Sequence, residues 1–188
     1  MMEVRWHGRG GQGAKTASQV LAVAYLKEGK SVQAFPEYGP ERSGAPMLAY
    51  VRVADRKILR RCAVTDPDVV IVLDPSLTRE IPITEGLRPD GRLLLNIENM
   101  DRAGAKVAAL GERALAVPAD RLALESGTKF PNVVLLGAYA AWMGAPTLEH
   151  LEEAFLESTH VSEAARQASI NAMRAGYAAG ERGKSNGQ

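Results

Sequence analysis

The residues best suited to chemistry in this sequence stand near its start, in the run Gly8-Arg9-Gly10-Gly11-Gln12-Gly13. Glycines at this spacing allow a tight turn and let backbone amides approach a phosphate or another anion closely. Glycines can also serve only to reverse the chain. Four glycines in six positions increase the conformational entropy of the unfolded chain, which lowers the stability of the fold. Such a cost is expected where a molecule must approach the backbone closely, so contact with a ligand or partner is favoured. The run therefore predicts an anion-binding turn.

The same run meets the dinucleotide-binding fingerprint through Gly8, Gly10 and Gly13. In that class of protein, an acidic residue at the end of the second strand binds the ribose of the cofactor. The candidate second strand, residues 31–35, ends without an acidic residue, and Glu37 follows only in the proline-rich loop beyond it. This arrangement disfavours NAD as the ligand.

A P-loop nucleotide site is the other alternative. In that site a Lys-Ser or Lys-Thr pair directly follows the last glycine, whereas here Ala14 precedes Lys15 and Thr16. One extra residue turns the lysine by about 100° around the helix. The apolar segment ending at Asp74 resembles the strand and aspartate that hold magnesium in such enzymes, although an aspartate there can also simply begin a turn. A stand-alone P-loop-like nucleotide-binding ATPase thus stays open as the alternative.

A strand before the glycine run and a helix after it must position these residues. Residues 4–7 alternate apolar and polar side chains, and Ala14–Lys27 carries apolar residues at helical spacing. With residues 31–35 as a second strand, the segment forms a βαβ unit of about thirty residues, which predicts two parallel strands. The unbroken apolar run 69–73 predicts a central strand buried on both faces.

The remaining strands predict a mixed sheet. Residues 47–53 and 57–61 flank a polar turn, which favours an antiparallel hairpin. Shorter strands are expected at residues 92–97 and 114–117. Together these elements indicate an α/β fold with a mixed, mostly parallel sheet.

Helices dominate the C-terminal part of the chain. They are expected over residues 132–143, 148–156 and 162–179, with Thr147 as the N-cap of the second. Because no internal repeat or linker divides the sequence, we expect a single domain over residues 1–180. Residues 181–188 lack apolar side chains and predict a flexible C-terminal tail.

Composition limits the classes of partner. The 23 Lys and Arg residues nearly balance the 22 Asp and Glu residues, so no overall charge favours nucleic acid or a membrane surface. The single cysteine, Cys62, excludes an internal disulfide or an iron–sulfur cluster held by this chain alone, and we expect it in the core. No metal-ligand spacing, signal peptide or membrane span is evident, so we expect no metal site and a cytoplasmic protein.

The glycine run and the loop Tyr38-Gly39-Pro40-Glu41-Arg42-Ser43-Gly44-Ala45-Pro46 together closely resemble the gamma subunit of 2-oxoacid:ferredoxin oxidoreductases of the pyruvate type. The resemblance extends through Asp74 and the helix start at residues 132–138, so it covers nearly the whole chain. Ser43 and Ala45 depart from the arginine and glycine of many relatives, which bears on the substrate subtype rather than on the family. The fold implied is a three-layer α/β/α sandwich.

The resemblance implies an activity that belongs to a complex. Such enzymes convert a 2-oxoacid such as pyruvate, coenzyme A and oxidised ferredoxin into acyl-CoA, CO₂ and reduced ferredoxin. They use thiamine diphosphate, Mg²⁺ and 4Fe–4S clusters. This chain has one cysteine and no thiamine-type Gly-Asp-Gly motif, so the resemblance assigns these cofactors to partner alpha, beta and delta (ferredoxin-like) subunits. We expect no catalytic residue in this chain and no activity of the chain alone.

Within such a complex, the resemblance implies that the glycine run lies beside the coenzyme A path. Coenzyme A carries a pyrophosphate and a 3′-phosphate, which the amides of Gly10, Gly11 and Gly13 would contact. Arg9 and Lys15 would add positive charge. The expected residues on the coenzyme A side are Gly8, Arg9, Gly10, Gly11, Gln12, Gly13, Lys15 and Thr16.

Two further segments suggest contacts with other chains. Tyr38, Gly39, Pro40, Glu41 and Arg42 form either an interface element against the catalytic chains or a crossover loop within this chain, and the sequence favours neither. The cluster Arg56, Lys57, Arg60 and Arg61 suits an acidic partner such as a ferredoxin-like chain, although such runs are also typical of a solvated surface.

Overall fold

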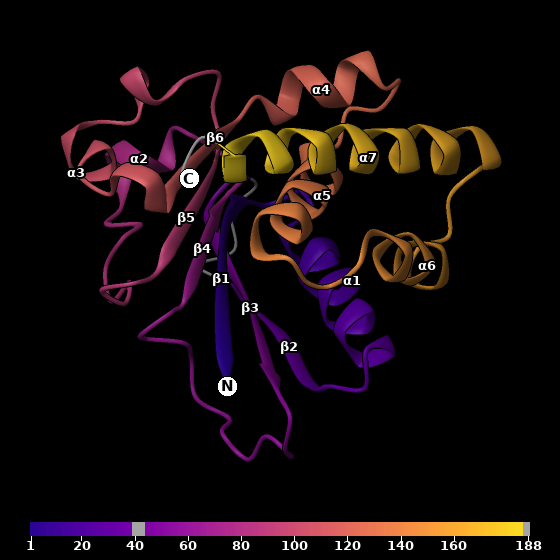
Figure 1. Ribbon diagram of the computed structural model, residues 1–188, viewed down its shortest axis with the longest axis horizontal. Helices are drawn as coiled ribbons and strands as arrows, with labels where there is room; N and C mark the ends of the chain where they lie inside the picture. The colour runs from indigo at the N-terminus through magenta and orange to yellow at the C-terminus, as the bar shows by residue number, and fades with distance from the viewer. Residues whose placement is uncertain (39–43, 186–188) are drawn as a thin grey trace.

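A computed structural model describes residues 1–38 and 44–185, and all structural statements below concern these residues. Their six strands form one sheet with the order β2-β3-β1-β4-β5-β6 (Figure 1). The strands are β1 (Met2–Arg9), β2 (Ser31–Tyr38), β3 (Pro46–Ala54), β4 (Val69–Val72), β5 (Arg92–Asn96) and β6 (Ala114–Val117). Of these described strands, only β3 runs against the others. The predicted mixed, mostly parallel sheet is confirmed.

The pairing of β3 corrects the predicted hairpin. Residues 57–61 form no strand, and β3 instead pairs antiparallel with β2, from Ser31 opposite Ala54 to Tyr38 opposite Met47. β2 is longer than expected because it continues through Pro36 and Glu37 to Tyr38. β1 and β2 do run in the same direction, but β3 lies between them. The segment 57–61 is too rich in exposed charge to offer an apolar face for packing.

The long helices lie where the sequence predicts them. The described helices are α1 (Ala14–Lys27), α2 (Leu77–Glu80), α3 (Ala105–Ala108), α4 (Ala119–Glu125), α5 (Pro131–Met143), α6 (Leu148–Ser158) and α7 (Glu163–Ser185). Thr147 caps α6, since its hydroxyl accepts a hydrogen bond from the His150 amide at 3.2 Å. α7 corrects the predicted tail, because residues 181–185 continue the helix. Residues 186–188 lie outside the described residues.

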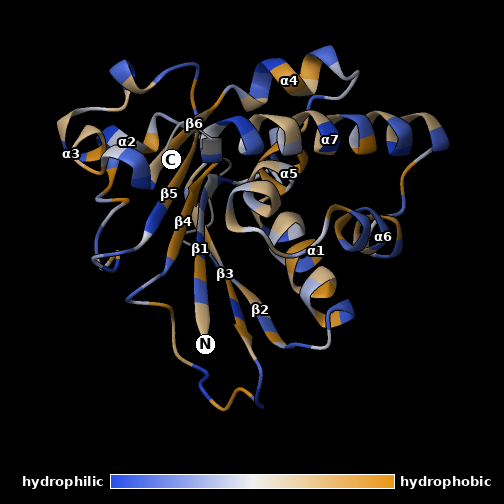
Figure 2. Ribbon diagram, viewed as in Figure 1, coloured by the Kyte–Doolittle hydropathy of each residue, from blue (hydrophilic) through white to orange (hydrophobic). Residues whose placement is uncertain are grey.

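Helices cover both faces of the sheet, as expected for three layers (Figure 1). On one face, α1, α5 and α7 pack over Trp6, Ile71 and Leu94 in a large apolar core. On the other face, the short helices α2 and α3 flank a smaller core that contains Val70 and Leu95. Hydrophobic colouring follows the strands and the inner sides of the helices (Figure 2). β4 contributes to both cores, which confirms its predicted burial on both faces.

Close approach between α5 and α7 depends on glycine. A Cβ at Gly137 on α5 would lie 1.9 Å from the Met173 carbonyl oxygen, and a Cβ at Gly176 on α7 would lie 1.9 Å from the Val134 carbonyl oxygen. Both distances are far shorter than any real contact, so the two backbones meet with no side chain between them. This crossing holds α5 in place, and the N-terminus of α5 in turn reaches the glycine run.

A buried polar face distinguishes β1 and β3 from the rest of the sheet. Arg52 of β3 donates from Nε to Glu3 Oε1 of β1 at 2.7 Å, and both side chains are buried. Its Nη2 donates to the carbonyl oxygens of Cys62 and Ala63 at 2.7 and 3.2 Å. Arg52 thereby fastens the β3–β4 loop to the sheet. Cys62 itself is exposed, so its predicted place in the core is wrong. The loop is held mainly through the two carbonyl oxygens, with a longer contact of 3.8 Å from Arg52 Nη2 to Cys62 Sγ.

A second buried arginine fastens the segment after α2. Arg5 donates from Nη2 to the carbonyl oxygens of Ile83 and Glu85 at 3.0 and 2.6 Å, and from Nε to His7 Nε2 at 3.0 Å. Burial, followed by the nearby charge of Arg5, lowers the pKa of His7 to about 3, so this histidine is neutral at pH 7. His7 is therefore part of a structural anchor, in agreement with the ordinary role that a histidine at a strand end usually has.

Candidate functional site

The glycine run connects the end of β1 to the start of α1, at the carboxyl edge of the parallel strands. Gly11 and Gly13 adopt positive φ angles of 93° and 80°, which side chains rarely tolerate. The amide of Gly10 donates to the carbonyl oxygen of Ala45, directly before β3, at 3.2 Å. The structure thus brings the glycine run directly against the described end of the second family motif.

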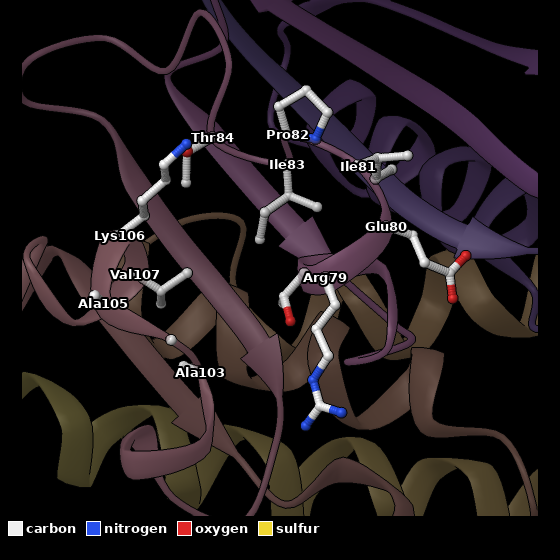
Figure 3. A pocket seen from close by; sticks show the side chains of 12 residues that line it. Arg79, Glu80, Ile81, Pro82, Ile83, Thr84, Ala103, Ala105, Lys106 and Val107 are labelled. Atoms are coloured by element: carbon white, nitrogen blue, oxygen red, sulfur yellow. The ribbon is translucent and has the colours of Figure 1, made fainter.

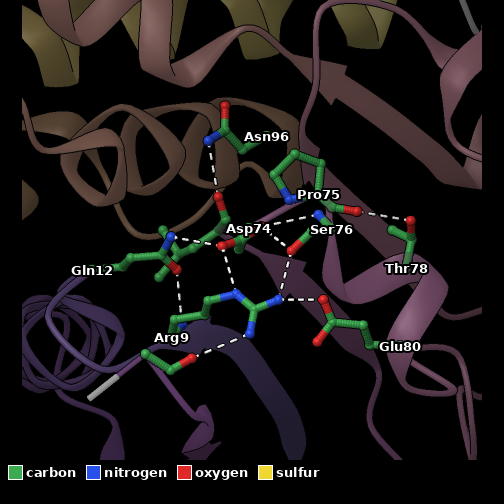
Figure 4. A network of polar contacts seen from close by, with 10 residues as sticks. Arg9, Gln12, Asp74, Pro75, Ser76, Thr78, Glu80 and Asn96 are labelled. Atoms are coloured by element: carbon green, nitrogen blue, oxygen red, sulfur yellow. Dashed lines mark hydrogen bonds and ion pairs between the residues drawn. The ribbon is translucent and has the colours of Figure 1, made fainter.

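Arg9 is the centre of a polar network (Figure 4). Its Nε donates to Asp74 Oδ2 at 3.0 Å and its Nη1 to the Gly44 carbonyl oxygen at 3.1 Å. Its Nη2 donates to Ser76 Oγ at 2.7 Å and to a carboxylate oxygen of Glu80. The hydrogen bond to Glu80, opposed by some burial and aided by the charges of Glu80 and Asp74, raises the pKa of Arg9. All three guanidinium nitrogens are therefore already engaged.

Asp74 joins this network to the loop after β4. Its Oδ2 accepts from Arg9 and from Gln12 Nε2, each at 3.0 Å, and its Oδ1 accepts from the Ser76 amide and hydroxyl at 2.9 and 2.6 Å. Partial burial would raise the pKa of Asp74, but the hydrogen bonds from Ser76 and Gln12 and the charge of Arg9 outweigh it and lower that pKa. Asp74 begins a turn, as an aspartate at a strand end often does.

Gln12 closes the glycine run on itself. Its Oε1 accepts from the Arg9 amide at 2.7 Å, and the Gln12 amide donates to the Arg9 carbonyl oxygen at 3.1 Å. With Nε2 on Asp74, the Gln12 side chain links the turn to the neighbouring strand end. Gln12 thus has a positioning role that the sequence pattern did not specify.

Asn132 brings a second helix to the same point. It stands in the first turn of α5, is only 5% exposed, and donates from Nδ2 to the Gly13 carbonyl oxygen at 3.2 Å. A Cβ on Gly13 would lie 2.5 Å from that same nitrogen, so only glycine fits there. The N-termini of α1 and α5 therefore converge at Gly13. The family resemblance included this helix start, but nothing in the sequence predicted its contact with the glycine run.

The first turn of α1 is uncapped. No side chain caps it, and it contains no acidic residue. Among the described residues, the amides of Ala14, Lys15 and Thr16 donate to no acceptor. Lys15 is exposed, and its side chain forms no ion pair within the described chain. Helix amides and a free ammonium group together form the arrangement that binds phosphate.

The other predicted site residues that the structure describes take no part in this polar network. Gly8 is buried, and a Cβ there would lie 3.0 Å from Leu73 Cδ1, so it serves packing between β1 and β4. Tyr38 ends β2. The predicted interface residues Gly39, Pro40, Glu41 and Arg42 lie outside the described residues, and the structure adds nothing on them.

Several residues around the network were not predicted from the sequence. Glu80 lies on the short helix α2, and Asn96 ends β5, where its Nδ2 donates to the Leu73 carbonyl oxygen at 2.9 Å. Asn96 Oδ1 also accepts from the Asp120 amide at 3.1 Å, which ties α4 to the same strand edge. The available signal in the sequence was the position of polar residues at the ends of buried strands, because the carboxyl ends of parallel strands meet at one edge of the sheet.

Open cavities flank this edge. One of about 330 Å³ is lined by Ser76, Arg79, Asn96 and Arg102 among others. Another of about 460 Å³ separates α2 from α3, where Lys106 reaches toward Thr84 and Arg79 points away from them (Figure 3). Neither brings an unpaired buried polar group of the described chain toward its interior. The described residues contain no cluster of metal-ligating side chains and no helix long and apolar enough to cross a membrane.

The fold and the two joined motifs define a gamma-type subunit of a 2-oxoacid:ferredoxin oxidoreductase, as the resemblance predicted. The chain belongs to the pyruvate ferredoxin/flavodoxin oxidoreductase family, whose model matches residues 3–179. It is 40% identical over 159 residues to pyruvate synthase subunit PorC of Methanocaldococcus jannaschii, covering 84% of this chain and 86% of the relative. It is 43% identical over 160 residues to the pyruvate/ketoisovalerate oxidoreductases common subunit gamma of Thermococcus kodakarensis, with 84% and 86% covered.

Solved structures agree with this assignment. The crystal structure of pyruvate oxidoreductase subunit PORC from Thermotoga maritima superimposes with a TM-score of 0.78 at 40% identity, over 94% of this chain and 95% of that one. A 2-oxoglutarate:ferredoxin oxidoreductase from Magnetococcus marinus, solved with 2-oxoglutarate, coenzyme A and succinyl-CoA bound, shares the fold with a TM-score of 0.73 at 19% identity. This chain covers 31% of that longer polypeptide and is itself covered over 96% of its length.

These comparisons give no support to the stand-alone ATPase. The geometry disfavours it as well, because both oxygens of Asp74 already accept hydrogen bonds from Arg9, Gln12 and Ser76. A carboxylate in that state is not free to hold magnesium for a nucleotide. The chain is therefore a subunit of an enzyme complex.

Proposed function

We propose that this chain lines the coenzyme A path of its complex and holds phosphate groups of that substrate at the N-terminus of α1. The observation that carries the proposal is the uncapped first turn of α1, with unpaired amides among the described residues and an exposed Lys15 beside them. Coenzyme A carries a pyrophosphate and a 3′-phosphate. The relative from Magnetococcus marinus was solved with coenzyme A bound, which makes it the ligand to test.

Each part of the turn has a distinct task in this proposal. Gly11 and Gly13 keep the backbone free of side chains so that a phosphate can approach the first turn of α1. The predicted phosphate contact of the Gly10 amide is replaced, because that amide already donates to the Ala45 carbonyl oxygen. Lys15 supplies the charge, and Thr16 completes the wall on the coenzyme A side. Because none of these groups changes oxidation state, the chain contributes binding and assembly rather than electron transfer.

Arg9 acts through the other residues of the turn. Since its guanidinium already donates to Asp74, Gly44, Ser76 and Glu80, only one N–H group, on Nη1, is left, which is too few for a bidentate phosphate contact. We therefore propose that Arg9 fixes the glycine run against β3 and β4 and keeps its amides oriented. This replaces the direct contact that the sequence suggested.

The proposal assigns the remaining chemistry to partner chains. One cysteine cannot hold a 4Fe–4S cluster, so the clusters belong to other subunits, together with thiamine diphosphate and Mg²⁺. We name these partners alpha, beta and a ferredoxin-like delta subunit, with pyruvate as the 2-oxoacid, ferredoxin as the electron acceptor and the cytoplasm as the location. Tyr38, Gly39, Pro40, Glu41 and Arg42 serve as an interface element in this assembly.

Calorimetric titration of the assembled complex with coenzyme A tests the proposal. Loss of a charged donor to phosphate removes about 1.5–3 kcal/mol, so Lys15→Ala is expected to weaken binding by about tenfold or more. Arg9→Ala is expected to weaken binding as well, through loosening of the turn. Lys106→Ala, which removes an exposed lysine on α3, is the matched control. Unchanged affinity for coenzyme A in both site variants would refute the proposal.

A further inference from the structure

The β3–β4 loop carries a dense positive charge at the end of the sheet opposite the glycine run, at the bottom of the view in Figure 1. Residues 56–64 include Arg56, Lys57, Arg60 and Arg61 and contain no Asp or Glu. All four basic residues are exposed, and within the described chain none of them forms an ion pair. We call residues 56–61 the basic tip.

Within the described chain, no acidic side chain forms an ion pair with the basic tip. Asp55 accepts from Lys30 Nζ at 2.6 Å, although the charge of the neighbouring Arg56 also helps to lower its pKa. Asp66 accepts from the Thr65 hydroxyl at 2.7 Å, Asp68 pairs with Arg88 at 3.4 Å, and Glu3 is buried against Arg52. Most of the charge of the basic tip is therefore available to another molecule.

An apolar side chain stands in the middle of this charge. Leu59 is 81% exposed, which makes it the most exposed large apolar side chain among the described residues. The alternation of hydrophilic and hydrophobic colour along the loop is visible in Figure 2. An exposed apolar side chain flanked in sequence by arginines is typical of a protein interface, where arginine is enriched and an apolar centre is surrounded by a polar rim.

The base of the loop is fixed, so the basic tip is presented in one place. Arg52 holds the carbonyl oxygens of Cys62 and Ala63, and Val64 is buried directly after them. Arg88 donates to the Asp66 carbonyl oxygen at 3.1 Å. A preorganised loop loses less conformational entropy on docking than a mobile one.

We propose that the basic tip docks against an acidic face of a neighbouring subunit of the oxidoreductase complex, with Leu59 inserted into an apolar recess of that subunit. Charge complementarity selects an acidic face, and the exposed leucine favours a protein over nucleic acid or a lipid surface. The proposal rests on the membership of a multi-subunit family and is independent of the coenzyme A site, which lies at the other end of β1.

A second copy of this chain is disfavoured as the occupant. The most acidic helix, α6, already pairs Glu152 with Arg174, and it pairs Glu153 and Glu157 with Lys27. Basic tips from two copies would also repel each other if they met.

Co-expression with the other subunits of the complex, followed by purification through a tag on this chain, tests the proposal. One variant changes Arg56, Lys57, Arg60 and Arg61 to Gln, and a second is Leu59→Ser. Loss of four exposed ion pairs with the partner, or of one apolar anchor, is expected to raise the dissociation constant of the complex about tenfold to hundredfold at 0.1 M NaCl. Wild-type assembly is expected to weaken steeply as NaCl rises, and assembly of the Gln variant to depend less on salt.

Matched controls are Leu26→Ser, at a leucine that is 57% exposed on α1, and Lys106→Gln on α3. Equal thermal unfolding temperatures of the isolated variants exclude misfolding as the cause, since every changed side chain is exposed. Recovery of all subunits by both loop variants, with wild-type salt dependence, overturns the proposal. So does loop-dependent self-association of the isolated chain, or loop-dependent sedimentation with phosphatidylserine vesicles while assembly is unchanged.

Discussion

Gly13 should be the least replaceable position of the glycine run. A methyl group there would lie 2.5 Å from Asn132 Nδ2 and 3.0 Å from Asn132 Cγ, and the residue has a φ angle of 80°. The left-handed backbone costs an alanine about 1–2 kcal/mol. The carboxamide must also move and give up its 3.2 Å hydrogen bond to the Gly13 carbonyl oxygen, which costs about 1 kcal/mol more. We expect Gly13→Ala to lower the free energy of unfolding by about 2–3 kcal/mol.

Gly11 provides the matched control. Its φ angle is 93°, but a Cβ would meet no atom within 4 Å. Gly11→Ala should therefore cost only the backbone strain of about 1–2 kcal/mol. Urea unfolding of the purified chain, followed by circular dichroism, measures both values.

A double-mutant cycle isolates the contact with Asn132. In the Asn132→Ala background, the clash and the hydrogen bond are both gone, so Gly13→Ala should cost no more than Gly11→Ala. The difference between the two backgrounds should amount to about 1 kcal/mol or more. If Gly13→Ala and Gly11→Ala are equally destabilising in the wild-type background, the convergence of α1 and α5 at Gly13 is refuted.

Three further outcomes follow from the buried and charged groups. Arg52→Met leaves the Glu3 carboxylate buried and unpaired, so the free energy of unfolding should fall by about 3–5 kcal/mol in urea titrations, and adding Glu3→Gln should restore part of it. Because the pKa of His7 is lowered to about 3 in the folded chain, the unfolded state binds the proton first, and stability present above pH 6.5 should decline as pH falls from about 6.5 to about 3. Between pH 7 and 4.5 the free energy of unfolding should fall by about 3 kcal/mol, and this pH dependence should be weaker in His7→Gln. An unchanged pH dependence in that variant would show that another group takes up the proton. Purified wild-type chain should hydrolyse no ATP in the presence of Mg²⁺, and hydrolysis that is lost in Lys15→Ala would restore the ATPase interpretation.

Local patterns in the sequence were sufficient for most of the fold. The alternation in β1, the apolar run in β4 and the helical spacing of α1 and α5 depend on neighbours along the chain, and each element appears where its pattern predicts. Thr147 before α6 is also a local signal. Strand partners are not local, and the hairpin error shows this. A polar turn at residues 54–56 favoured pairing of β3 with residues 57–61, whereas its actual partners are β1 and β2, which both precede it in sequence.

In the candidate site, too, local features could be predicted from the sequence and long-range contacts could not. The turn at the glycine run, between β1 and α1, could be predicted because glycine spacing constrains the backbone directly. The engagement of Arg9 could not, since its acceptors on Asp74, Ser76 and Glu80 come from segments more than sixty residues away in sequence. The contact between Asn132 and Gly13 spans 119 positions and depends on the close crossing of α5 and α7. Such contacts follow from packing of the whole chain rather than from any single motif.

An experimental structure of the assembled complex with coenzyme A bound is the strongest test of the proposed coenzyme A site. Phosphate oxygens of coenzyme A are expected at hydrogen-bond distance, about 3 Å, from amides in the first turn of α1 and from Lys15 Nζ. Arg9 is expected to keep its bonds to Asp74 and Ser76 in the occupied site. Coenzyme A bound with all of its phosphates held by other chains, and with the first turn of α1 facing solvent, would refute the proposed site.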